Sequence, residues 1–79
     1  MNTHARSYKV SICGKEYSLI SDESDQHVQQ AAQMVDKLMQ EIQGASSDRI
    51  EYQKLAILSA LQLASKLIRA QEKTHEQKK

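Results

Sequence analysis

Several residue types that usually build the core of a small protein are absent or rare in this chain. Its 79 residues include no phenylalanine, no tryptophan and no proline, with three tyrosines and two glycines. Any core must therefore be assembled from aliphatic side chains, in a domain too small to bury much of its surface. Domains of this size usually need disulfides, a metal or association with other chains to be stable.

The residues present favour the last of these stabilisers. Cys13 is the only cysteine, so no disulfide can form within one chain. The histidines His4, His27 and His75 lie far apart, and none has a cysteine or a second histidine at the spacing of a metal site. We therefore expect no metal site, and we expect self-association.

An excess of charge of one sign is also lacking. The chain has 11 basic and 10 acidic side chains, which are interspersed. Without a basic stripe we expect no nucleic-acid partner and no attraction to an anionic membrane. No run approaches the roughly 20 apolar residues of a membrane span, and residues 1–7 lack the apolar segment of a signal peptide. Together with the single thiol, this indicates a cytoplasmic protein.

Residues 8–20 alternate between apolar and polar side chains, as the two strands of a hairpin do. Gly14 and Lys15 lie between the apolar positions, and glycine in the first position suits a two-residue type II′ turn. That turn would pair Ile12 with Tyr17. A two-stranded hairpin is marginal by itself, so its apolar face is expected to lie on a helix. The apolar positions are Tyr8, Val10, Ile12, Tyr17 and Leu19.

Two helices are predicted after the hairpin. Residues 21–25 supply candidate N-cap residues and negative charge for the first helix, and Gly44 is expected to end it in a left-handed conformation. Asp48 and Glu51 have the spacing of a capping box and are expected to open the second helix. The apolar stripe of the first helix consists of Val28, Ala31, Ala32, Val35, Leu38, Met39 and Ile42.

The second helix is apolar around most of its circumference. Between Leu55 and Ala64, only Ser59 and Gln62 are polar. Such a helix must be buried on more than one side, so one side is expected to pack within the chain and another against a second chain. The residues expected in that seam are Ile57, Ala60, Leu61, Ala64, Leu67 and Ile68.

These patterns predict a small α+β fold, in which an N-terminal β-hairpin is followed by two helices. The second helix is expected to form an intersubunit helical or coiled-coil interface. We expect a disordered segment at 1–7, a hairpin-helix head at 8–44, a long dimerisation helix at 45–74 and a frayed tail at 75–79.

No group of residues indicates catalysis. Cys13 has no histidine or second cysteine nearby to activate it, and a tolerated strand residue is the favoured interpretation. Lys15 projects a cation from a rigid turn, which suits contact with a partner. Lysine is also common in turns that contact only solvent. The sequence therefore favours neither interpretation of Lys15, a partner contact or a solvated turn residue. We expect no enzymatic activity.

Three blocks of sequence, in order, resemble one family. They are 10–17 (VSICGKEY), 31–39 (AAQMVDKLM) and 54–64 (KLAILSALQLA), of which the last is the most distinctive. They resemble ZapA, a family of small bacterial cell-division proteins that associate with the tubulin-like FtsZ. The resemblance implies a non-enzymatic homodimer, or a dimer of such dimers, without a cofactor.

By this resemblance, the protein would bind FtsZ filaments at mid-cell, bundle them by multivalent cross-linking and stabilise the division ring. The residues that fall on FtsZ-facing positions of the family are Lys15, Gln53 and Leu58. Lys15 stands where arginine is frequent, and Gln53 stands where a carboxylate is common. Leu58 fits an apolar contact or, equally, a dimer seam. The alternative is a generic helical dimeric adaptor whose client is a protein other than FtsZ.

Overall fold

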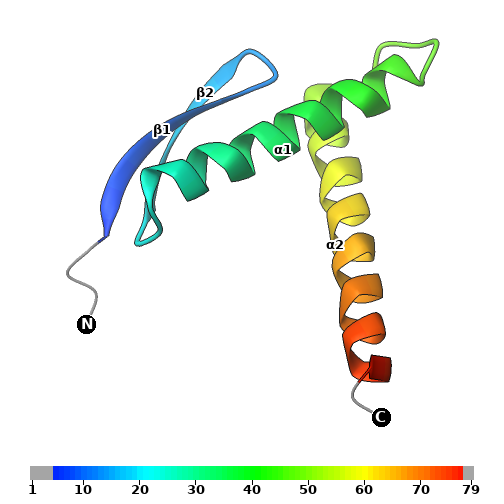
Figure 1. The fold of residues 1–79 in the computed structure, drawn as a ribbon. Coiled ribbons are helices and arrows are strands. Elements are labelled where there is room, and N and C mark those ends of the chain that lie inside the picture. The colour runs from blue at the N-terminus through cyan, green and yellow to red at the C-terminus, as the bar shows by residue number, and fades with distance from the viewer. Residues whose placement is uncertain (1–4, 78–79) are drawn as a thin grey trace. The chain divides into compact units, whose positions relative to one another are not determined.

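The computed structural model describes residues 5–77, with side chains described up to residue 73. The elements follow in the order β1 (Arg6–Ile12), β2 (Lys15–Ser21), α1 (Asp25–Gly44) and α2 (Tyr52–Gln77), as Figure 1 shows. The predicted fold class, a hairpin followed by two helices of which the second is longer, is confirmed. The chain divides into two compact units, Met1–Glu41 and Ile42–Lys79.

The hairpin turn lies one residue earlier than predicted. The two residues between the strands are Cys13 and Gly14, with φ angles of 49° and 82°. Positive φ at both positions is what a type I′ turn requires. As a result, Tyr17 pairs with Val10 and not with Ile12. The predicted type II′ turn and its pairing were wrong.

The changed register leaves the same side chains on the apolar face, because a shift of two positions preserves the alternation of faces. Val10 is 3% exposed and lies at the centre of this face. Strand β1 begins at Arg6, because its first two residues pair with the end of β2. Part of the segment expected to be disordered is therefore strand, and residues 1–4 lie outside the described residues. The side chains packed around the core on this face are Tyr8, Ile12 and Leu19.

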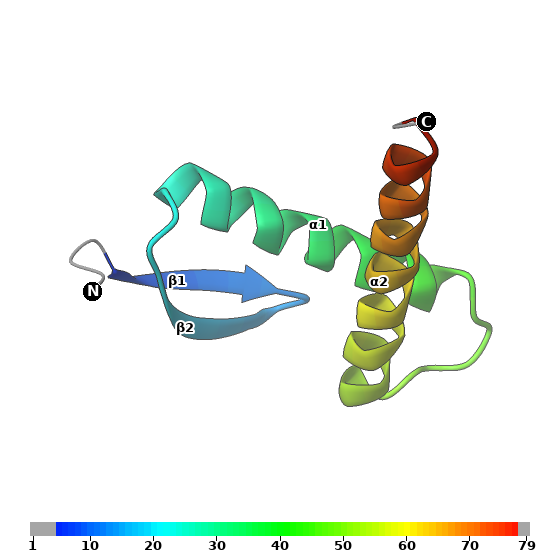
Figure 2. The ribbon, with the colours of Figure 1, turned by 90° about the horizontal axis from the view of Figure 1, so that it is seen from below.

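The core of the first unit is small. Helix α1 lies along the hairpin, as Figure 2 shows, and Val10 clusters with Val28 and Ala32. Full burial of one aliphatic side chain stabilises a protein by about 1.5–3 kcal/mol. A core of this size therefore contributes only a small stabilisation. Polar contacts made by the hairpin then supply a larger share of the stability of this unit.

Two hydrogen bonds join the hairpin to α1 and to the segment just before it. The Tyr8 hydroxyl donates to the Glu23 carbonyl at 2.9 Å, and the Gln29 amide donates to the Lys9 carbonyl at 3.1 Å. The second bond pairs the Lys9 carbonyl of β1. Unpaired backbone groups at the edge of a strand can otherwise form hydrogen bonds with a strand of another chain.

Helix α1 begins with a serine cap. The Ser24 hydroxyl accepts a hydrogen bond from the His27 N–H at 3.1 Å, and the Ser24 carbonyl accepts from the Val28 N–H at 3.0 Å. This is the arrangement of an N-cap residue, and it satisfies a donor that the helix itself leaves free. Ser24 is one of the cap candidates that the sequence predicted.

The end of α1 differs from the prediction. Gly44 is the last helical residue, and its φ is not positive, so the expected left-handed cap was wrong. The Ala45 N–H instead donates to the Ile42 carbonyl at 3.3 Å, and the Ser46 N–H donates to the Gln43 carbonyl at 3.1 Å. These tighter three-residue bonds satisfy carbonyls of the last turn without a left-handed residue.

Helix α2 begins later than predicted. The Gln43 amide donates to the Asp48 carbonyl at 2.9 Å and accepts from the Ile50 N–H at 2.9 Å. Such side-chain bonds to the backbone hold a loop in a non-helical conformation. The first bond of α2 runs from the Leu55 N–H to the Glu51 carbonyl, at 2.9 Å. The expected capping box of Asp48 and Glu51 was therefore wrong.

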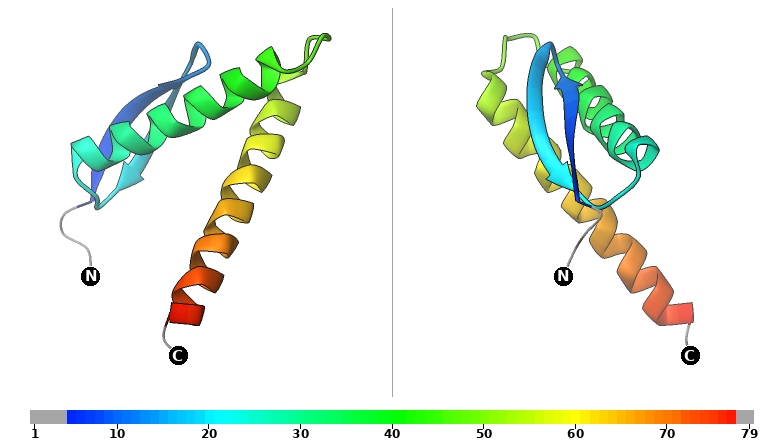
Figure 3. Two further views of the ribbon diagram at one scale, coloured as in Figure 1. Left: turned by 45° about the vertical axis from the view of Figure 1, so that its right-hand side comes forward. Right: turned by 90° about the vertical axis from the view of Figure 1, so that its left-hand side faces the viewer.

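Helix α2 is continuous to Gln77 (Figure 3), past the expected helix end at residue 74. The sequence after Gly44 contains no glycine or proline that would interrupt it. Residues 78 and 79 of the expected frayed tail lie outside the described residues. Ser59 is 1% exposed, and its hydroxyl has no hydrogen-bond partner.

Replacing Ser59 with alanine should stabilise the protein. The substitution removes a buried hydroxyl without a partner and raises helix propensity, and we expect about 1–2 kcal/mol in the free energy of unfolding. Urea denaturation at fixed protein concentration measures it. Ser65→Ala is the matched control, because Ser65 is exposed on the same helix and carries only the propensity gain. Equal effects of the two substitutions would show that burial of the Ser59 hydroxyl costs nothing.

Candidate functional site

One side of α2 carries a row of exposed apolar side chains. Leu61 is 62% exposed and Ile57 is 53% exposed. The spacing of 57, 61, 64 and 68 brings these positions onto one side of a helix. We call this row the α2 apolar face, and it consists of Ile57, Ala60, Leu61, Ala64, Leu67 and Ile68, all of them exposed. These are the six residues that the sequence predicts for a seam between chains, and the seam itself stays a prediction.

The opposite side of α2 is different. Leu55 and Ser59 are buried, and Ala56 and Leu63 beside them are half-buried. Beyond Leu63, every described side chain up to residue 73 is exposed. The helix therefore has one side that is covered and another whose apolar residues face solvent. Exposed apolar rows of this kind are typical of surfaces that bind another protein.

The three residues that the resemblance places at a partner surface have distinct environments. Lys15 is exposed and is the first residue of β2, directly after the turn and not within it. Gln53 is exposed in the first turn of α2, one helical turn before Ile57 and on the side of the α2 apolar face. Leu58 is half-buried. Lys15 belongs to the first unit, and the other two belong to the second.

A carboxylate on α1 holds the turn that precedes Lys15. The Cys13 N–H donates to Asp36 Oδ1 at 2.5 Å, and the Cys13 thiol donates to the Asp36 carbonyl at 3.8 Å. The other carboxylate oxygen, Oδ2, accepts from the Gln40 amide at 2.9 Å. Asp36 thus uses both oxygens at once, one toward the turn and one along its own helix.

The contact offsets a conformational cost at the turn. A residue with a side chain in the left-handed region, such as Cys13 at φ 49°, costs on the order of 1–2 kcal/mol. A hydrogen bond to a charged group contributes about 1.5–3 kcal/mol. The Asp36 contact is therefore large enough to maintain a conformation that cysteine does not favour.

Burial, together with the Asp36 contact, makes Cys13 a poor nucleophile. Burial raises the pKa of the Cys13 thiol above its ordinary value of 9.0, and the nearby charge of Asp36 and the hydrogen bond to it raise the pKa further. The thiol form therefore predominates at neutral pH, and the thiolate is the reactive form.

An open groove lies between the hairpin and α1. Its volume is about 340 Å³, and its walls are mainly apolar side chains, among them Val10, Leu19, Ala31 and Val35. At its rim, His27 Nδ1 lies 3.9 Å from Glu23 Oε1, and both side chains are exposed. An apolar groove with this rim can accept a side chain of another molecule.

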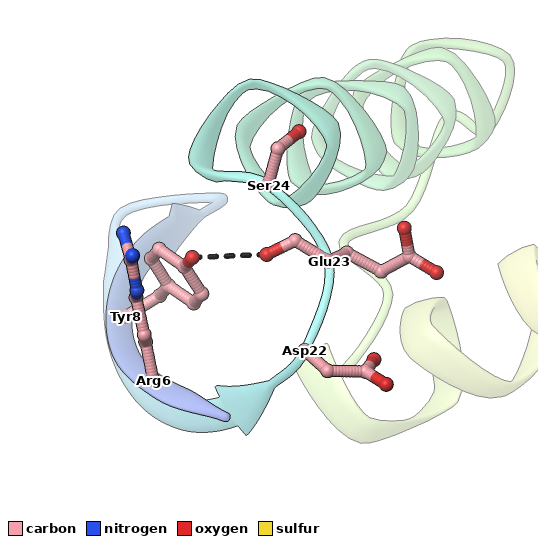
Figure 4. Close-up of a pocket in the computed structure, with 5 residues that line it drawn as sticks. All are labelled: Arg6, Tyr8, Asp22, Glu23 and Ser24. Atoms are coloured by element: carbon pink, nitrogen blue, oxygen red, sulfur yellow. Dashed lines mark hydrogen bonds between the residues drawn. The ribbon is translucent and has the colours of Figure 1, made fainter. Parts of the chain in front are cut away.

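A second hollow, of about 290 Å³, lies where the open end of the hairpin meets the start of α1. Figure 4 shows its lining and the hydrogen bond from the Tyr8 hydroxyl to the Glu23 carbonyl. The Asp22 and Glu23 carboxylates extend away from the Tyr8 ring. The residues at this hollow are Arg6, Tyr8, Asp22, Glu23 and Ser24.

Within residues 5–77, no group of three or more histidine, cysteine, aspartate or glutamate side chains is placed to hold a metal ion. Over the same residues, neither helix has the combination of length and hydropathy needed to cross a membrane. The features most suited to a function are therefore the α2 apolar face and the turn before Lys15.

Asp36 is the residue that sequence reasoning missed. It lies on the first helix beside the apolar stripe, and this position predicts only a solvated carboxylate. Its partner is a backbone N–H, which carries no signal in the sequence. One feature of the sequence does indicate such a contact. A type I′ turn at Cys13 and Gly14 would place a residue other than glycine at positive φ, and that conformation has to be stabilised by another part of the chain.

Comparison with known proteins gives one consistent result. The family model described as "Cell division protein ZapA" matches residues 8–79. The cell division protein ZapA of Bacillus thuringiensis (strain Al Hakam) is 34% identical over 70 residues, which cover 89% of this chain and 76% of that relative. The ZapA of Geobacillus sp. (strain WCH70) is 32% identical over 63 residues, covering 80% and 71%.

A solved structure agrees with these relatives. It is described as a ZapA mutant dimer from Geobacillus stearothermophilus and matches with a TM-score of 0.74 at 29% identity. The match covers 91% of this chain and 83% of that one.

Alkylation of Cys13 should report on the Asp36 contact. In the folded protein, the rate of reaction with iodoacetamide should reach half its maximum above pH 9.0, because the pKa of the thiol is raised. Asp36→Asn should lower that midpoint, since it removes the charge. A raised folded-state pKa also means that the thiol contributes stability below about pH 9, which is lost as pH rises through the folded pKa. The urea-unfolded chain is the control, and a folded-state midpoint no higher than its own would contradict the contact.

Proposed function

Because the chain belongs to the ZapA family of cell division proteins, we propose that it pairs through α2 into a homodimer and cross-links FtsZ filaments. The observation that carries the proposal is the α2 apolar face, whose large side chains Ile57, Leu61 and Ile68 are each more than half exposed. A relative of known structure is described as a dimer.

The residue spacing of this face fits helix pairing. Positions 57, 61, 64 and 68 follow the alternating steps of four and three that place side chains at the seam of a coiled coil. The small residues Ala60 and Ala64 allow two helix backbones to approach closely. Two copies related by a twofold axis would each cover the other's face, which is the commonest symmetry of homodimers.

Pairing through α2 gives one assembly two copies of the hairpin unit. Each copy would bind a filament weakly, and a second attachment by the same assembly gains from a raised local concentration. The assembly can then connect neighbouring FtsZ filaments into bundles and stabilise the division ring at mid-cell. This role requires no catalysis and no cofactor.

The contacts proposed for FtsZ are Lys15, Gln53 and Leu58. Lys15 supports the proposal because it is exposed beside a turn that is held in place by Asp36. Gln53 is also exposed, whereas half-buried Leu58 would contribute a smaller apolar contact. Two such dimers could associate further into a dimer of dimers, as the family resemblance implies.

A charge placed in the α2 apolar face should separate the subunits. Ile57→Glu puts a carboxylate where the partner helix would pack, and burying such a charge without a partner is very costly. Light scattering over a concentration series should then give a monomer mass. The same variant should lose the ability to bundle FtsZ filaments, as measured by low-speed pelleting.

Gln62→Glu is the matched control for this substitution. Gln62 is exposed on the same helix but lies off the α2 apolar face, so the same carboxylate there should leave the dimer intact. A monomeric Ile57→Glu variant that still bundled filaments fully would overturn the bivalent mechanism.

Charge reversal at the hairpin should weaken filament binding. Lys15→Glu is expected to lower co-sedimentation with assembled FtsZ by roughly tenfold or more in apparent affinity, because a charged contact becomes repulsive. Lys9→Glu changes another exposed lysine of the hairpin, away from the turn, and should have a much smaller effect. If the unaltered chain does not pellet with FtsZ above background, an adaptor for another client becomes the better interpretation.

A further inference from the structure

Two registers of the hairpin would be equally compatible with its apolar face, of which the structure shows one. A turn at residues 13–14 and a turn at 14–15 differ by two positions in strand pairing, so both place Val10 and its neighbours on the same face. The apolar pattern alone therefore does not determine which turn forms. A second contact has to select one of them.

Asp36 has the geometry for that selection. In the observed turn, Cys13 is the first of the two turn residues, and its N–H is available to donate to Asp36 Oδ1. With the turn at 14–15, Cys13 would instead be the last strand residue, opposite Glu16. Its N–H would then pair with the opposing strand, as the closing pair of a two-residue hairpin does. The Asp36 contact can form in one register only.

We propose that Asp36 is a positioning residue, which selects the Cys13–Gly14 turn and so sets where Lys15 is presented to an acidic surface of the filament. In the observed register, Lys15 is a strand residue opposite Ile12, whereas in the other it would lie within the turn. The Gln40 amide, which donates to the second carboxylate oxygen, holds Asp36 in the required orientation. This inference rests on the proposed FtsZ contact at Lys15.

The first part of the test concerns the hairpin alone. Asp36→Ala should accelerate hydrogen exchange of the Cys13 amide by about tenfold or more, as expected when a hydrogen bond to a charged group is lost. It should also weaken the cross-strand nuclear Overhauser effects between Val10 and Tyr17 in favour of those between Ile12 and Tyr17. Glu41→Ala, which removes an exposed carboxylate of the same helix, should change neither. Unchanged exchange and unchanged pairing in Asp36→Ala would overturn the selection of register.

The second part concerns filament binding. Asp36→Ala should weaken co-sedimentation with FtsZ to the level of Lys15→Ala, and the double variant should bind no more weakly than either single one. Asp36→Asn, which keeps an oxygen at Oδ1, should restore most of the binding. Further weakening in the double variant, or full binding by Asp36→Ala while Lys15→Ala binds weakly, would overturn the positioning role.

The two proposals can fail separately. If Lys15→Ala binds FtsZ as well as the unaltered chain, the proposed contact is wrong, and the exchange and pairing data still decide whether Asp36 selects the register. If Asp36→Ala does not fold, Gln40→Ala provides the same readouts, because it frees the Asp36 side chain without removing it. An unchanged Cys13 amide exchange in Gln40→Ala would then contradict the proposal.

Discussion

In the first unit, the hairpin is held to α1 by an apolar contact in which Val10 packs against Val28 and Ala32. Neither partner is stable without it, since a lone hairpin is marginal and a helix of this length gains most of its stability from packing. The buried members of this contact are small aliphatic side chains, so its apolar area is modest. Hydrogen bonds from Tyr8, Gln29 and Cys13 therefore contribute a large share of the precision with which the hairpin is held.

The second unit has the opposite property, because α2 has more apolar surface than one chain covers. Its buried side contains Leu55 and Ser59, while the α2 apolar face remains exposed. The same composition that limits the core thus supplies a surface for association. In the proposed function these two properties act together, since a pairing helix joins hairpin units that each provide one weak contact.

Periodic features of the sequence predicted most of the fold. The alternation of strands and the three-four spacing of helices arise from burial of one face, and burial leaves a direct trace in residue type. The turn and the start of α2 were predicted wrongly, because both depend on side chains that bind distant backbone groups. Asp36 holds Cys13 in a conformation that cysteine does not favour, and Gln43 holds the loop around Asp48 out of the helix. The apolar row on α2 could be predicted from apolar excess, whereas the Asp36 contact is visible only in the folded structure.

The hydrogen bonds that join the hairpin to α1 and to the segment before it also have a consequence for synthesis. They join residues 15, 20 and 23 positions apart, all before Glu41. Contacts this close in sequence form rapidly, and the N-terminal part of a chain leaves the ribosome first. The hairpin unit can therefore be complete before the α2 apolar face has emerged. A nascent chain then exposes the α2 apolar face last, when the apolar side chains of the hairpin unit are already packed and no longer compete for it.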